Sequence, residues 1–118
     1  MIRILIADDA TFMRMRCARL LVEKGYEVTE ATNGAEALEK YKQNKPDAVL
    51  LDITMPKMDG IVTLQVIIKV DPEAKVAMVT AMGQRSMVIK ALKEGAKDFV
   101  IKPFDAARVL ATVQKLVT

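Results

Sequence analysis

The chain has 118 residues, of which 52% are hydrophobic and 28% are charged, and its formal net charge at pH 7 is +3. That length is typical of one domain, and the apolar fraction is sufficient for a packed core. The sequence contains no histidine and one cysteine, which excludes a histidine phosphoacceptor, a histidine metal site and an internal disulfide. Basic residues are dispersed among acidic ones and aromatic residues make up only 4%, so we expect no nucleic-acid partner.

No apolar run approaches the roughly 20 residues that span a membrane. The first seven residues run directly into Asp8, which is unlike a signal peptide. We therefore expect a single cytoplasmic domain over residues 1–118 that is monomeric and has no membrane partner.

Five strand patterns follow one another along the chain, separated by stretches with helical spacing. Four of them are short and continuously apolar, which is typical of parallel strands covered on both faces. The second is more polar, with Glu27, Thr29 and Glu30, and is expected at an edge of the sheet. The five patterns lie at residues 4–7, 26–31, 48–51, 76–79 and 99–101.

The intervening helices have recognisable ends. Gly25 and Gly95 suit the left-handed residue that follows a helix. Pro46 and Pro72 prevent the second and third helices from continuing, and Asp105 is a candidate N-cap for the last helix. Alternation of strands and helices with right-handed crossovers predicts an α/β fold with a single doubly wound, five-stranded parallel sheet.

A polar residue stands at the end of four of the five strand patterns. Asp8 and Asp9 follow the first, Asp52 follows the third, Thr80 follows the fourth and Lys102 follows the fifth. The carboxyl ends of parallel strands meet at one edge of the sheet, where open α/β sheets bind their ligands. One such residue alone would be read as a helix cap or a solvated turn residue, but the set of four positions indicates a functional site.

These residue types are suited to phosphoryl transfer. Three neighbouring carboxylates repel one another unless a cation lies between them, and Mg²⁺ is a hard ion that prefers oxygen ligands. Lys102 would supply a second positive charge, and Thr80 offers a hydroxyl donor for a phosphoryl oxygen. A metal and an ammonium beside one carboxylate are what transfer of a phosphoryl group to that carboxylate requires.

Two other kinds of site agree less well with the sequence. A flavodoxin-type phosphate cradle would need Ser, Thr and Gly after the first strand in place of Asp8 and Asp9, and neither glycine-rich nucleotide-binding motif is present. An aspartate-nucleophile phosphatase would place a second acid two residues after Asp52, where this chain has Thr54. The phosphatase remains the enzymatic alternative.

Along its whole length the chain resembles the response-regulator receiver family. The matching segments are Asp8-Asp9, residues 52–60 (DITMPKMDG), Thr80-Ala81 and Lys102-Pro103-Phe104. The resemblance implies a (βα)5, flavodoxin-like fold with strand order 2-1-3-4-5. In that order the first and third strands are neighbours, which would bring Asp9 next to Asp52.

The resemblance also implies a role for each residue of the site. Asp52 would be the phosphoacceptor, and Lys102 would contact the phosphoryl group. Asp9 and Asp52 would bind Mg²⁺ directly, together with the backbone carbonyl of Thr54. Asp8 would act on the metal mainly through water.

Further residues would carry the signal away from the site. By resemblance, Thr80 would be the switch hydroxyl, Phe99 would change rotamer with it, and Pro103 would follow a cis peptide bond. The responsive surface would lie around the fourth helix, where basic residues would dock an acidic segment of a partner. These basic residues are Arg85, Lys90, Lys93 and Lys97.

Within the family, the chain looks most like the stand-alone chemotaxis regulators. Such a protein would accept its phosphoryl group from a sensor histidine kinase and bind a flagellar switch protein or another effector, and a phosphatase could reset it. It would promote transfer to and hydrolysis from its own aspartate, and would not be an enzyme for an external substrate. The alternative within the family is a stand-alone phosphorelay intermediate of the sporulation type.

Two positions depart from a common family pattern. Phe99 lacks the hydroxyl of the tyrosine often found there, so a switch at this residue would depend on packing alone. Met82 lies two residues after Thr80 and is apolar, where some members have an acid or an amide beside the path of an attacking water.

Overall fold

The computed structural model describes residues 1–118 and contains five strands and five helices in strict alternation. The strands are β1 (Arg3–Ala7), β2 (Glu27–Ala31), β3 (Ala48–Asp52), β4 (Val76–Ala81) and β5 (Asp98–Lys102). The helices are α1 (Thr11–Glu23), α2 (Gly34–Asn44), α3 (Gly60–Val70), α4 (Arg85–Lys93) and α5 (Ala106–Val117). None of these helices has the length and apolar character needed to cross a membrane.

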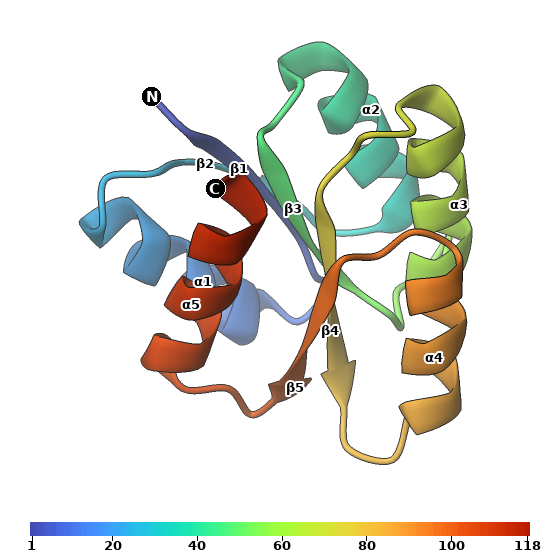
Figure 1. The fold of residues 1–118 in the computed structure, drawn as a ribbon. Coiled ribbons are helices and arrows are strands. Elements are labelled where there is room, and N and C mark those ends of the chain that lie inside the picture. The colour runs from blue at the N-terminus through green and yellow to red at the C-terminus, as the bar shows by residue number, and fades with distance from the viewer.

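The five strands form one parallel sheet in the order β2-β1-β3-β4-β5. Helices α1 and α5 cover one face of the sheet, and α2, α3 and α4 cover the other (Figure 1). The predicted doubly wound, flavodoxin-like α/β fold is therefore confirmed, and the more polar β2 lies at an edge as expected.

The alternating side chains of each central strand divide between two hydrophobic clusters. In β1, Ile4 and Ile6 belong to the cluster of 14 buried residues that includes α1 and α5 side chains. Leu5 and Ala7 belong to the cluster of 18 buried residues that includes side chains of α2, α3 and α4. Because both faces of the strand are covered, its sequence is continuously apolar.

The helix ends agree with the residues that were expected to set them. Gly25 and Gly95 have positive φ angles of 92° and 116°, which residues with a side chain rarely adopt. The Asp105 carboxylate accepts a hydrogen bond from the Arg108 backbone N–H, which confirms it as the N-cap of α5. Helix α2 ends at Asn44, before Pro46.

Strands β3, β4 and β5 extend further than their apolar patterns. Asp52 still pairs with Val79 across the β3–β4 ladder, and Ala81 pairs with Lys102 across the β4–β5 ladder. Asp52 and Lys102 are the last residues of β3 and β5, and Thr80 is the last but one of β4, whereas all three were expected just after their strands. Ladder pairing continues to these residues because their backbone groups bond whatever the side chain is, and this fixes their Cα positions within the sheet.

Candidate functional site

Three aspartates meet at the carboxyl edge of the sheet. Asp8 and Asp9 follow β1, and Asp52 is the last residue of the neighbouring strand β3. One carboxylate oxygen from each of the three lies within 4.8 Å of the others. Asp8 and Asp52 are buried, with exposed fractions of 5% and 6%, and Asp9 is exposed. The cluster joins two buried anions to one that faces solvent.

Backbone contacts hold Asp8 in the first loop. Its carboxylate accepts a hydrogen bond from the Ala10 N–H at 2.9 Å. Its carbonyl oxygen accepts one from the guanidinium of Arg14, which also pairs with Glu30 on the neighbouring strand β2. The loop between β1 and α1 is therefore tied to the edge strand, and the acid at its start has a fixed direction.

Lys102 brings a positive charge to two of the three acids. Its ammonium nitrogen lies 2.8 Å from Asp8 Oδ2 and 3.3 Å from Asp52 Oδ2. Lys102 ends β5, and the peptide bond that joins it to Pro103 is cis, in agreement with the sequence analysis. The lysine reaches the cluster from two strands away, across the end of β4.

Burial and neighbouring charge change the proton affinity of both partners. Burial is the largest effect on Asp52, and with the Asp8 carboxylate beside it the pKa of Asp52 is raised to about 6, although Lys102 and the Thr54 N–H act in the opposite direction. Burial alone would lower the pKa of Lys102. Its hydrogen bond and ion pair with Asp8, together with the charge of Asp52, outweigh that effect, so the net direction is upward. Burial and the Asp8 charge thus disfavour the anionic form of Asp52, and the Lys102 ammonium favours it.

The loop after β3 packs closely against Asp52. The Thr54 backbone N–H donates to Asp52 Oδ1 at 3.4 Å, and Asp59 caps α3 by accepting from the Val62 N–H. Gly60, the first residue of α3, lies so close that a Cβ atom there would be 2.1 Å from the carbonyl oxygen of Asp52. The start of α3 can approach the acid only because residue 60 has no side chain.

Thr80 lies in the same edge of the sheet and is almost completely buried, with 1% exposed. Its hydroxyl lies 2.8 Å from Gln84 Oε1 and 3.1 Å from the carbonyl oxygen of Ala81. The side chain of Gln84 also reaches the hydroxyl of Thr54, at 3.0 Å. Gln84 was not predicted as a site residue, and the only sequence signal for it is its position four residues after Thr80, just before α4.

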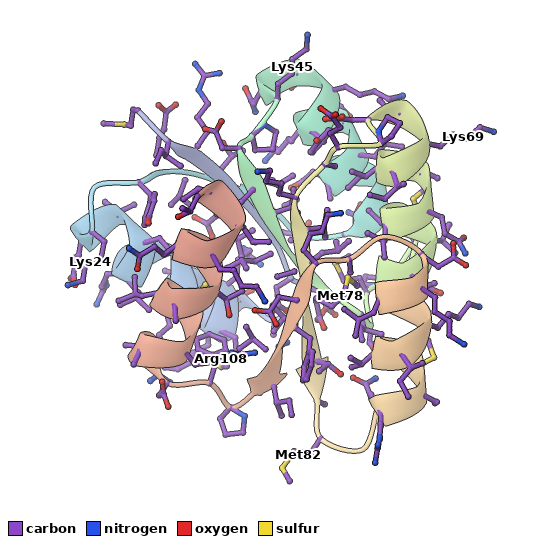
Figure 2. All side chains as sticks on the ribbon, viewed as in Figure 1. Lys24, Lys45, Lys69, Met78, Met82 and Arg108 are labelled. Atoms are coloured by element: carbon purple, nitrogen blue, oxygen red, sulfur yellow. The ribbon has the colours of Figure 1, made fainter.

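Phe99 lies beside Thr80 in an open groove of about 370 Å³ between β5 and α4. The apolar side chains around it include Met82, Ile89, Leu92 and Ile101, whose exposed fractions run from 40% to 78%. In Figure 2, Met82 extends from the β4–α4 loop into solvent, at the opposite end of the molecule from Lys45. The groove therefore extends from Thr80 and Phe99 to the outer surface.

Arg108 is a second residue that sequence reasoning missed. From α5 it donates to the carbonyl oxygen of Phe99 at 2.5 Å and to Asp98 Oδ1 at 3.3 Å, and its guanidinium carbon lies 6.0 Å from the centre of the Phe99 ring. Figure 2 shows it projecting toward β5. A cation over the ring favours the present ring position.

The basic residues predicted around the fourth helix are exposed and stand apart from the acid cluster. Arg85 begins α4, and Lys90 and Lys93 lie in its last turn. Lys97 lies between α4 and β5 and is also exposed. Only Arg85 among them lines the groove beside Phe99.

Comparison with known proteins agrees with this geometry. The family model of the response regulator receiver domain matches residues 4–114, and the chain belongs to that family. The chain is 55% identical to the chemotaxis protein CheY of Thermotoga maritima over 115 residues, which are 97% of this chain and 96% of that protein. It is 57% identical to CheY of Bacillus subtilis over 114 residues, or 96% and 95% of the two chains.

Among solved structures, a chain of the CheX–CheY–BeF3–Mg complex from Borrelia burgdorferi superposes with a TM-score of 0.93 at 39% identity, covering 99% of this chain and 90% of that one. The receiver domain of NtrX from Brucella abortus superposes with a TM-score of 0.93 at 32% identity, covering 97% of each chain. The present chain is thus a CheY-like chemotaxis response regulator, with an acidic phosphorylation-site cluster formed by Asp8, Asp9 and Asp52. It is a signalling protein rather than a catalytic enzyme.

Proposed function

We propose that Asp52 accepts a phosphoryl group from a phosphohistidine of a sensor histidine kinase. In this step the N–P bond of the donor breaks, phosphorus bonds to a carboxylate oxygen of Asp52, and the released imidazole nitrogen takes up a proton. One observation carries the proposal: Asp52 is a buried carboxylate 3.3 Å from the Lys102 ammonium and beside two further carboxylates. A side chain placed there can attack a phosphorus atom while cations balance the charge.

The three aspartates fit a magnesium ion by their chemistry, since they offer three hard, anionic oxygens within 4.8 Å of one another. Asp9 and Asp52 would bind the ion directly with the backbone carbonyl of Thr54, and Asp8 would act mainly through water. When bound, the metal would offset the charge on the phosphoryl oxygens. The solved Borrelia burgdorferi complex contains magnesium, which supports the choice of ion.

The residues of the chain have separate tasks in this reaction. Asp52 attacks as the anion, so a pKa of about 6 keeps it competent at neutral pH. Lys102 holds a phosphoryl oxygen with its ammonium, and Thr80 donates its hydroxyl to another. In a separate hydrolysis step, water attacks phosphorus, the bond to Asp52 breaks, the proton of the water goes to solvent or to the departing phosphate, and inorganic phosphate leaves with the carboxylate restored.

Phosphorylation would then change the groove beside α4. Movement of the Thr80 hydroxyl toward a phosphoryl oxygen would make room for Phe99 to turn inward, and the groove that both residues line would change shape. Arg85, Lys90, Lys93 and Lys97 would receive an acidic amphipathic segment of a flagellar switch protein. A partner can favour the switched state only through its differential affinity for the two states.

We assign the kinase and the flagellar switch protein as partners by the similarity to CheY. A phosphatase partner is supported by the Borrelia burgdorferi relative, which is in complex with CheX. Residues 1–118 would act as one receiver domain, monomeric and in the cytoplasm.

The proposal is tested by incubation with acetyl phosphate and Mg²⁺, followed by intact-mass measurement. One phosphoryl group should be added to the parent chain. None should be added to Asp52→Asn, or to the parent chain when Mg²⁺ is chelated. Asp105→Asn is the matched control, because asparagine can also cap α5. Full labelling of Asp52→Asn would show that another residue is the acceptor.

A further inference from the structure

One amide side chain, that of Gln84, joins two loops of the site. Its oxygen lies 2.8 Å from the Thr80 hydroxyl and 2.9 Å from the Ala81 backbone nitrogen, and its nitrogen lies 3.0 Å from the Thr54 hydroxyl. The Ala81 N–H can only donate, so the amide oxygen must face it and the amide nitrogen must face Thr54. This orientation leaves one direction for the bond to Thr80: the hydroxyl donates and Gln84 accepts.

The hydroxyl proton of Thr80 is therefore already used in a hydrogen bond within the protein. Its acceptors are Gln84 Oε1 at 2.8 Å and the carbonyl oxygen of Ala81 at 3.1 Å. Thr80 is 1% exposed, so solvent has little access to replace either acceptor. A phosphoryl group on Asp52 could receive this proton only after the bond to Gln84 is broken.

We propose that Gln84 is a positioning residue that holds the Thr80 hydroxyl away from the phosphorylation site, and so opposes the switched state. This inference rests on the proposed function, in which Thr80 binds a phosphoryl oxygen. Gln84 competes with the phosphoryl group for one proton, and the difference between the two bonds sets part of the switching equilibrium.

Gln84 also connects the Thr80 hydroxyl to the groove beside α4. Gln84 is the N-cap of α4, and its carbonyl oxygen accepts from the Val88 N–H in the first turn of that helix. Its side chain does not cap the helix but points back to Thr80 and Thr54. Release of the amide would free the loop that begins α4, and Thr80, Gln84 and Val88 all line the groove that contains Phe99.

The test uses beryllofluoride, a phosphoryl analogue, with saturating Mg²⁺ and isothermal titration calorimetry on the full chain. We expect Gln84→Ala to bind beryllofluoride about two- to tenfold more tightly than the parent, the range that corresponds to one neutral hydrogen bond. Gln65→Ala is the matched control, because Gln65 is exposed on α3 and should leave the affinity unchanged. Weaker or equal binding by Gln84→Ala would overturn the proposal.

Two further variants separate this role from a general effect on the loop. In Gln84→Glu the acceptor oxygen is kept, so binding should not become tighter; a gain equal to that of Gln84→Ala would contradict the competition for the proton. In a Thr80→Val background the effect of Gln84→Ala should disappear, because no hydroxyl remains to be held. An effect that persists without the hydroxyl would assign Gln84 a structural role only.

The same titrations distinguish failure of the role of Gln84 from failure of Asp52 as the phosphoacceptor. Binding of beryllofluoride to the parent with no change in Gln84→Ala removes the role of Gln84 and leaves Asp52 as the acceptor. Absence of binding to the parent and to every variant would remove both.

Discussion

The ammonium of Lys102 forms its shorter ion pair with Asp8, at 2.8 Å. Its second pair, with Asp52, is 3.3 Å long. The positive charge thus lies between the two buried carboxylates that are also proposed to attract the metal. Lysine and metal therefore repel each other while both favour the anionic form of Asp52.

We expect Lys102→Ala to tighten Mg²⁺ binding and to slow phosphorylation of Asp52. Loss of one positive charge a few ångströms away in a partly solvated site should raise the affinity for the ion by about tenfold. The phosphoryl group at the same time loses its ammonium contact. Titration calorimetry with MgCl2 and the rate of labelling by acetyl phosphate measure the two effects.

Lys42→Ala is the control for this change, since Lys42 is exposed in the last turn of α2. It should leave both quantities as they are in the parent. If Lys102→Ala bound Mg²⁺ no more tightly than Lys42→Ala, the inference that the Lys102 ammonium repels the metal would be wrong.

A second prediction concerns the close approach of α3 to Asp52. In Gly60→Ala the new Cβ would lie 2.1 Å from the Asp52 carbonyl oxygen and 2.6 Å from Ile53 Cα, so the backbone beside the acceptor must move. We expect a loss of about 1–3 kcal/mol in the free energy of unfolding, typical of overpacking. Urea unfolding measures the loss, and the rate of labelling by acetyl phosphate should fall as well.

Gly25→Ala provides a comparison that is strained but remote. At Gly25 a Cβ meets nothing within 4 Å, and the cost comes from the positive φ of 92°, about 1–2 kcal/mol. Labelling of Asp52 should be unaffected in this variant. Equal labelling rates in Gly60→Ala and Gly25→Ala would show that the approach of α3 does not position the acceptor.

The acid cluster could be predicted from the sequence because each member lies within two residues of a strand end. Parallel pairing then brings Asp8, Asp52 and Lys102 together whatever the loops do. Gln84 and Arg108 lie farther from a strand end, and their partners depend on how a loop turns or how α5 packs. Gln84 reaches Thr54 across 30 residues of sequence, and no local pattern encodes that contact.

A third prediction follows from Cys17, which is 4% exposed on α1. Burial, with smaller effects from Asp8 and Glu30, raises its pKa from 9.0 to about 12. Below pH 9 the thiol is protonated in both the folded and the unfolded chain, so it adds no pH dependence. Between pH 9 and 12 the unfolded chain loses this proton and the folded chain keeps it, which lowers the free energy of unfolding as pH rises.

The expected slope is up to about 1.4 kcal/mol per pH unit for each such group. Tyr41 adds to it at higher pH, because burial and its hydrogen bond to Asp71 raise the pKa of the phenol above its ordinary value. Urea unfolding at pH 7.5 and pH 10 should show a smaller loss for Cys17→Ala than for the parent. An identical loss in both chains would mean that the thiol is not protected by burial.

The last prediction concerns the surface of α4. Lys90 and Lys93 are exposed in its last turn, and Ile89 and Leu92 of the same helix are 45% and 40% exposed at the groove that Phe99 lines. An apolar groove with basic residues around it is complementary to an amphipathic segment that carries acidic residues. We expect such a segment of the flagellar switch protein to bind the beryllofluoride-activated chain several-fold more tightly than the inactive chain.

Charge reversal by Lys90→Glu or Lys93→Glu should weaken this binding, and more strongly at low salt. Charges at a rim are screened over about 8 Å at physiological ionic strength and over about 30 Å at 0.01 M, so the loss should grow as salt is removed. Lys69→Glu, in the last turn of α3, is the matched control for a reversed charge in a last helical turn. Labelling of Asp52 should survive all three reversals, because none of these lysines pairs with the acid cluster. Fluorescence anisotropy of a labelled peptide at two salt concentrations measures these affinities. If neither α4 reversal changed the affinity, the peptide would dock on another surface. If the affinity were equal with and without beryllofluoride, activation would not control binding.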